Sequence, residues 1–214
     1  MELTDLQLPE FDFGDNAEAQ PDPVESEGKK GKRRDSVCLV RTDRHVYRRA
    51  YGVTKLLEAA STMALQDGHS YHFLTGGDVD GLSYLQLVLL YQPLDYCLFS
   101  TWCMAAEDIL AFDEWLEAGK IKRLDAYVGE IFPSSYRVEW KMLQDLFAKR
   151  KCGRVAVFRN HAKIFAGTGP RFDFGIETSA NINTNPRTEN GCITIGADAF
   201  KFYKDFFDGI VSIA

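Results

Sequence analysis

The chain lacks the features that mark membrane, secreted and zinc-binding proteins. Within its 214 residues no apolar run approaches the roughly 20 residues that cross a bilayer. Its N-terminus lacks the charged-then-apolar pattern of a signal peptide. The five cysteines are dispersed and odd in number, none forms Cys-x-x-Cys, and no His/Cys cluster has zinc spacing. We therefore expect buried free thiols, no structural metal, no membrane partner and a cytoplasmic protein.

Two common catalytic motifs are also missing. Gly76-Gly77 is not followed by Gly-Lys-Ser/Thr, so the phosphate-binding loop of nucleotide hydrolases is excluded. The serines at 134–135 do not stand in Gly-x-Ser-x-Gly, so a hydrolase nucleophile elbow is unsupported. Asp78 and Asp80 follow a predicted strand and could bind a cation. A Gly-rich turn with an aspartate that caps the next helix explains them better.

Positive charge is absent from the first 28 residues, which hold nine of the 31 acidic residues and no Lys or Arg. The remaining 22 acidic residues stand against 25 Lys and Arg, a net of +3, although the whole chain is −6. We predict that residues 1–35 form a disordered tail, which contains the basic run 29–34 near its end. We predict that residues 36–214 form one domain. The mildly basic domain permits a polyanionic substrate, which the acidic half of the tail could mimic over a basic cleft.

From Val37 onward, apolar spacing alternates between strand and helix patterns. This alternation predicts an α/β fold with a mixed β-sheet sandwiched between helices. The expected helices are 46–65, 82–91, 105–118, 136–151 and 197–211. The expected strands are 71–74, 95–101, 123–132, 154–158, 161–166, 172–178 and 192–195.

His161 and Lys163 form the most informative pair in the chain. On a strand, residues two apart point to the same face, so an imidazole and an ammonium would project side by side. An imidazole can attack phosphorus, and an ammonium can hold a phosphate oxygen. The pair alone is also compatible with a half-exposed strand. Asn181 adds an amide that can donate to a phosphate oxygen, and Glu189 a carboxylate that can fix the imidazole tautomer.

With these residues the chain resembles the phospholipase D superfamily, whose motif is His-x-Lys, commonly an Asp a few residues on, then Gly-Ser-x-Asn and a later Glu. The functional positions of that motif are matched by His161, Lys163, Ser179, Asn181 and Glu189. The chain departs from it at Thr178, where Gly is usual, and at Thr168, where the Asp is often found. These departures point away from lipid-cleaving members and toward the metal-independent nuclease branch.

The resemblance implies a phosphodiesterase, with no cofactor, in which His161 forms a phosphohistidine intermediate. Lys163 and Asn181 would stabilise the charge of the transition state, and Glu189 would orient His161. Members of the family use two copies of the motif. His45, His69 and His72 lack a Lys two residues on, so this chain has one copy and we expect a homodimer that shares one site.

Basic and aromatic residues near the motif are candidate contacts for a nucleic acid. We expect Trp102, Arg159 and Arg187 to bind substrate, and Asn160 and Arg171 could also meet a phosphate backbone. Trp102 at the edge of the core and the arginines as surface residues are equally good interpretations. Two other functions stay open, a decayed nucleic-acid-binding or scaffold protein and a phospholipid-cleaving enzyme.

Overall fold

The computed structural model describes residues 44–50 as backbone, and residues 56–58, 63–76, 79–182 and 187–213 in full. The chain divides into two units, Met1–Val37 and Cys38–Ala214. The predicted tail, the basic run 29–34 and Asp78 lie outside the described residues. Of the helices described, none combines the length and the apolar character needed to cross a bilayer.

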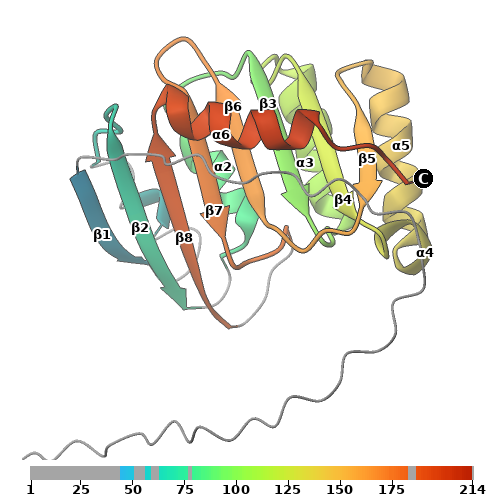
Figure 1. Ribbon diagram of the computed structural model, residues 1–214, viewed down its shortest axis with the longest axis horizontal. Helices are drawn as coiled ribbons and strands as arrows, with labels where there is room; N and C mark the ends of the chain where they lie inside the picture. Colours follow the sequence, from blue (N-terminus) through green and yellow to red (C-terminus); the bar gives the residue numbers. More distant parts are fainter. Residues whose placement is uncertain (1–43, 51–55, 59–62, 77–78, 183–186, 214) are drawn as a thin grey trace, which may run out of the picture. The chain divides into compact units, whose positions relative to one another are not determined.

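A mixed sheet of eight strands forms the centre of Cys38–Ala214, in the order β1-β2-β8-β7-β6-β3-β4-β5 (Figure 1). The predicted α/β fold class is confirmed. The strands are β1 (Arg44–Ala50), β2 (His69–Gly76), β3 (Tyr96–Thr101), β4 (Leu124–Gly129), β5 (Val155–Phe158), β6 (Ile164–Thr168), β7 (Phe174–Thr178) and β8 (Thr188–Ile195).

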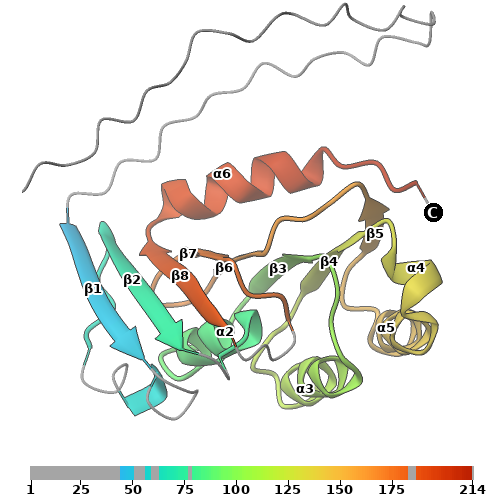
Figure 2. The ribbon, with the colours of Figure 1, turned by 90° about the horizontal axis from the view of Figure 1, so that it is seen from below.

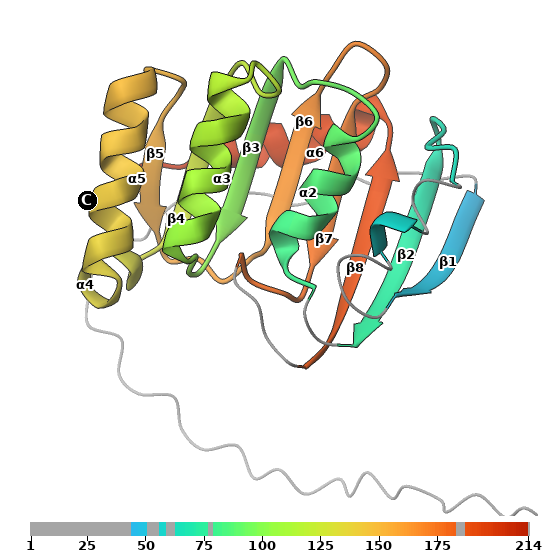
Figure 3. The same cartoon turned by 180° about the vertical axis from the view of Figure 1, so that it is seen from behind.

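Helices cover both faces of this sheet. Helix α6 crosses one face, and α2, α3 and α5 lie on the other, as Figures 2 and 3 show. One apolar cluster fills the side of α2, α3 and α5, and a smaller one around Tyr127 and Phe207 fills the side of α6. The helices are α2 (Gly81–Leu89), α3 (Ala106–Glu117), α4 (Phe132–Ser135), α5 (Arg137–Arg150) and α6 (Ala197–Asp208).

Local sequence sets where these helices begin and end. Asp80 caps α2, because its Oδ1 accepts hydrogen bonds from the backbone N–H of Ser83 at 2.8 Å and from its hydroxyl at 2.7 Å. The predicted capping role of Asp80 is confirmed. Helix α3 ends just before Gly119, whose φ of +68° favours glycine. Helix α5 ends at Arg150 and is followed by Lys151, which is left-handed with φ of 50°.

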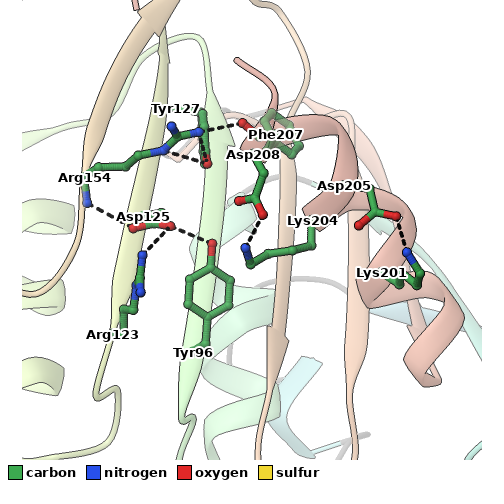
Figure 4. A network of polar contacts seen from close by, with 10 residues as sticks. All are labelled: Tyr96, Arg123, Asp125, Tyr127, Arg154, Lys201, Lys204, Asp205, Phe207 and Asp208. Carbon is green, nitrogen blue, oxygen red and sulfur yellow. Dashed lines mark hydrogen bonds and ion pairs between the residues drawn. The ribbon is translucent and has the colours of Figure 1, made fainter. Parts of the chain in front are cut away.

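Helix α6 is attached to the sheet through a polar network (Figure 4). Asp125, 1% exposed, accepts a hydrogen bond from the Tyr96 hydroxyl at 2.8 Å and from the backbone N–H of Arg154 at 3.0 Å. The Arg154 guanidinium donates to the Tyr127 hydroxyl and to the carbonyl oxygen of Phe207 on α6, both at 2.7 Å. These bonds satisfy the buried polar groups between α6 and strands β3, β4 and β5.

Two predictions of secondary structure are wrong, and a third extends too far, because the expected strand over 123–132 ends at Gly129 and Phe132 begins α4. The expected helix over 46–65 is instead strand β1 up to Ala50, which pairs in parallel with β2. Residues 56–58 are helical, residues 63–65 are not, and residues 51–55 and 59–62 lie outside the described residues. The expected strand over 161–166 begins at Ile164, so His161 and Lys163 precede β6. The four described cysteines are free, and all but Cys192 are buried.

Strand direction defines the edge of the sheet where the candidate residues meet. Strands β6 and β8 run opposite to the other six. The amino ends of β6 and β8 therefore lie beside the carboxyl ends of β2, β3, β4, β5 and β7. We call this edge the carboxyl edge; it is the lower edge in Figure 1. Ligands of open α/β sheets bind at such an edge.

Candidate active site at the carboxyl edge

His161 and Lys163 are in direct contact at the carboxyl edge, in the segment between β5 and β6. Lys163 Nζ lies 2.8 Å from His161 Nδ1, and it donates a hydrogen bond to the carbonyl oxygen of His161 at 2.7 Å. The predicted proximity is present, although it comes from an irregular turn and not from a strand. A charged lysine has only donors, so Nδ1 accepts and the proton of a neutral ring lies on Nε2.

The two side chains differ in exposure. His161 faces solvent, whereas Lys163 is 7% exposed. Burial lowers the pKa of Lys163, and the negative charge of Glu189 raises it in part. Burial raises the pKa of Cys103, whose thiol hydrogen-bonds Tyr136. Lys163 is thus a partly desolvated cation beside an accessible imidazole, an arrangement that strengthens its attraction for an anion.

Asn160 lies inside the protein and does not face a substrate, so that expectation was wrong. The residue is 8% exposed, and its amide Nδ2 donates to Ser100 Oγ at 2.9 Å. Its Oδ1 accepts from the backbone N–H of Ala162 at 3.0 Å. Sequence reasoning missed Ser100 as a partner in this arrangement. The two residues are 60 positions apart, and no local signal joins them.

Ser179 and Glu189 meet at the same edge, across β7 and β8. The Ser179 hydroxyl hydrogen-bonds Glu189 Oε2, and Ser179 Oγ accepts from the backbone N–H of Asn190 at 3.0 Å. Among the described residues, the hydrogen bonds of the His161 ring go to Lys163, so Glu189 does not orient that ring directly here. Its charge acts instead on Lys163.

Thr178 and Thr168 are the two departures from the family motif, and neither removes a group from the site. Thr178 is 9% exposed; its hydroxyl donates to the carbonyl oxygen of Asn190 at 2.9 Å and accepts from the N–H of Ala180 at 3.0 Å. Thr168 ends β6 at the opposite edge of the sheet, paired with Tyr96. Five strand residues separate it from Lys163 by about 16 Å.

Asn181 is held beside the start of α2. Its carbonyl oxygen accepts a hydrogen bond from the N–H of Gly81 at 2.9 Å. A Cβ on Gly81 would lie 3.1 Å from the carbonyl oxygen of Ala180, so the close approach favours glycine. The side-chain Oδ1 of Asn181 is buried without a partner among the described residues. Such an unsatisfied group is common where function constrains a side chain.

The predicted substrate contacts have different positions. The Trp102 ring lies 5.4 Å from the His161 ring, centroid to centroid. Arg159 and Arg187 are exposed, Arg159 directly after β5 and Arg187 directly before β8, so both lie at the carboxyl edge. Arg171 lies at the opposite edge, where its guanidinium donates to the carbonyl oxygen of Tyr91 at 2.9 Å. The expectation for Arg171 was therefore wrong.

A buried carboxylate lies at the start of α3, at this edge of the sheet. Asp108 accepts a hydrogen bond from the N–H of Ala105 at 2.8 Å, and burial raises its pKa to about 7, with the charge of Asp80 adding to the shift. Within the described part of the chain, no group of three His, Cys, Asp or Glu side chains is arranged to hold a metal ion.

No protein-family model matches the sequence, and no curated protein matches it. Solved structures do match. Phosphatidylserine synthase of Haemophilus influenzae Rd KW20 is 14% identical over 65% of this chain, with a TM-score of 0.49. Polyphosphate kinase of Porphyromonas gingivalis is 14% identical over 75% of this chain, with a TM-score of 0.48. The chain covers 37% of the first of these proteins and 28% of the second.

Proposed function

We propose that this chain is a metal-independent phosphodiesterase of the phospholipase D superfamily that cleaves nucleic acid through a phosphohistidine intermediate. The observation that carries the proposal is the contact between His161 and the partly desolvated Lys163, 2.8 Å from Nζ to Nδ1. Ser179, Asn181 and Glu189 gather at the same edge of the sheet. This set supplies a nucleophile and phosphate-oxygen donors without a metal ion.

Substrate binding has to free the lone pair of the imidazole. In the resting chain Lys163 Nζ donates to Nδ1 and so occupies the electron pair of that nitrogen. A non-bridging phosphate oxygen competes for the same ammonium, because it is negatively charged. The ring then attacks phosphorus, the P–O bond to the leaving group breaks, and a general acid protonates the departing oxygen. Water then gives a proton to the group that served as general acid and adds to phosphorus, the P–N bond breaks, and His161 is released.

Nucleic acid is the substrate class that the surroundings of the pair support. Arg159 and Arg187 are exposed at the carboxyl edge and can hold flanking phosphates. Trp102 lies against the His161 ring and offers an aromatic surface for a base. The chain outside its first 28 residues carries a net charge of +3, which suits a polyanion.

The departing oxygen requires a general acid, and we assign that role to His161 of a second copy, which as a neutral ring can then accept a proton from the attacking water. The chain contains one His-x-Lys sequence. A two-fold axis beside His161 would bring two imidazoles and two lysines into one site, one ring attacking while the other donates a proton. The active form is accordingly a homodimer.

The proposal is tested by cleavage of single- and double-stranded DNA and RNA oligonucleotides at low salt in excess EDTA. We expect His161→Ala to lower the rate by about 10³-fold or more. The control is His69→Ala, at the start of β2 on the opposite edge, which should stay within about twofold of the native rate.

Equal cleavage by the native chain and His161→Ala would overturn the catalytic assignment. Binding of tungstate, a phosphate analogue, without cleavage of any oligonucleotide would favour a decayed binding protein. Turnover of phosphatidylcholine vesicles in preference to oligonucleotides would identify a phospholipid-cleaving enzyme instead.

A further inference from the structure

We infer that Asn160 and Ser100 are positioning residues that hold the peptide of Ala162, and with it the spacing between His161 and Lys163. The inference rests on the proposed function, because it assigns these two side chains a role in the reaction of that pair. Neither residue is proposed to touch substrate. Both act through the backbone between the nucleophile and the cation.

Both hydrogen-bonding groups of Ala162 end on this buried pair. The N–H of Ala162 donates to Asn160 Oδ1 at 3.0 Å, and its carbonyl oxygen accepts from Ser100 Oγ at 3.1 Å. Asn160 Nδ2 donates to the same Ser100 Oγ at 2.9 Å, which closes a ring of three hydrogen bonds. The backbone of Ala162, the residue between His161 and Lys163, is thus held at both its N–H and its carbonyl oxygen.

We call the hydrogen-bonded side chains of Asn160 and Ser100 the clamp. The clamp is anchored to the central strands of the sheet. Ser100 is fully buried in β3, and Asn160 Nδ2 also lies 3.3 Å from the carbonyl oxygens of Thr101 and Tyr127, at the ends of β3 and β4. The backbone N–H of Asn160 donates to Glu130 Oε2 at 3.2 Å. An amide that uses its donors and its acceptor in a buried site cannot rearrange without leaving polar groups unsatisfied.

The clamp also explains why the sheet stops short of the reactive pair. Strand β6 pairs with β3 up to Ile164 opposite Ser100, and there the ladder ends. Beyond it the side chains of Ser100 and Asn160 take over the bonds that a strand partner would make. The irregular backbone lets Lys163 Nζ fold back to the carbonyl oxygen of His161 at 2.7 Å. A misplacement of about 1 Å in such a pair costs about 100-fold in rate.

The test compares Asn160→Asp and Ser100→Ala with a matched control at the opposite edge. Asn160→Asp keeps the acceptor for Ala162 and replaces the donor amide by a carboxylate oxygen. Gln92→Glu is the same change in a second buried amide, 3% exposed, whose Oε1 accepts from the N–H of Arg171 at 2.8 Å and whose Nε2 donates to the carbonyl oxygen of Phe172 at 2.7 Å. Thermal unfolding sets an assay temperature at which every variant is folded.

Two measurements are made on each variant, kcat and KM for an oligonucleotide in EDTA and the imidazole ¹⁵N chemical shifts of His161. We expect Asn160→Asp and Ser100→Ala to lower kcat about 100-fold with little change in KM and to move the ¹⁵N shifts. Gln92→Glu should alter neither quantity, even where it lowers the unfolding temperature.

A loss of kcat in Asn160→Asp and Ser100→Ala no greater than in Gln92→Glu would overturn the inference. If Asn160→Asp does not fold, Ser100→Ala alone decides. If the native chain cleaves nothing, the proposed function fails, and the clamp is then judged by the ¹⁵N shifts alone. ¹⁵N shifts that stay at their native values in both Asn160→Asp and Ser100→Ala would show that the clamp does not fix the spacing between His161 and Lys163.

Discussion

Lys163 is both buried and able to carry a positive charge, and in a folded protein burial disfavours the charged form. Its side chain is 7% exposed, and burial lowers its pKa, which means that the charged form is disfavoured relative to water. A purely structural residue at this position would be apolar. The chain instead keeps an ammonium in contact with His161, which is the pattern expected where function and stability compete.

Replacing Lys163 should therefore separate stability from activity. Lys163→Met keeps the volume of the side chain and removes its charge. We expect a phosphodiesterase rate lower by about 10²–10³-fold. The free energy of unfolding in urea should stay equal or rise by up to about 1 kcal/mol. Lys201→Met, on the exposed face of α6, serves as the control and should leave the rate unchanged.

A fall in stability equal to that of a buried apolar truncation would contradict this view of Lys163. It would mean that the hydrogen bonds from Nζ to Nδ1 and to the carbonyl oxygen of His161 hold the turn together. Lys163 would then act mainly to stabilise the fold.

At the residue scale, the sequence was sufficient to select the candidate site residues and insufficient to identify the residues that support them. His161, Lys163, Ser179, Asn181 and Glu189 follow the order of the motif, and the fold brings them to one edge of the sheet. Asn160 and Ser100 were not identified as a clamp, because their contact depends on strands β3 and β6 lying side by side. Such a contact leaves no trace in local spacing.

At the scale of elements, local pattern predicted most of the sheet and failed at its ends. The central strands β3 and β4 are wholly buried and mostly apolar, so the sequence indicated a strand at each of them. Residues 46–50 carry apolar positions at helical spacing, yet parallel pairing with β2 makes them a strand. Here a tertiary contact overrides a local preference.

The polar network under α6 gives a prediction at this scale. Asp125→Ala would leave the buried Tyr96 hydroxyl without its acceptor. We expect a loss of about 3 kcal/mol in the free energy of unfolding, measured by urea denaturation. Asp205→Ala breaks the exposed pair of Lys201 and Asp205 on α6 and should cost no more than about 0.5 kcal/mol.

The catalytic rate should not fall together with that loss of stability. Asp125 lies near the start of β4, toward the opposite edge of the sheet from His161. The rate per folded molecule of Asp125→Ala should equal that of the native chain at a temperature where both are folded. Losses of similar size in Asp125→Ala and Asp205→Ala would show that the network does not anchor α6.

At the scale of the whole molecule, the single His-x-Lys sequence is the constraint that matters. One imidazole cannot attack phosphorus and protonate the leaving oxygen in the same step. The proposed dimer supplies the second ring. The number of His-x-Lys sequences can be counted in the amino-acid sequence. The surface through which two copies of the chain would meet cannot be predicted from it, because that surface forms only when the chain folds.

Mixing native and inactive chains tests the shared site. His161→Ala and native chains are co-refolded in equal amounts, so that subunits pair at random. If each site needs both imidazoles, only native dimers cleave, and about a quarter of the native activity should remain. Independent sites would retain about half. Sedimentation analysis of the same samples should give a dimer, and an active monomer would exclude the shared site.

The division of the sheet into two edges has a practical consequence for work on this protein. Helix α3 starts at the carboxyl edge and, over its 12 residues, carries the chain about 18 Å away from it. The turn that follows, Ala118-Gly119-Lys120, is exposed, and nothing lies within 4 Å of where a Cβ on Gly119 would stand. A fluorophore or surface tether attached through Lys120 would therefore report on the chain while leaving the carboxyl edge unobstructed.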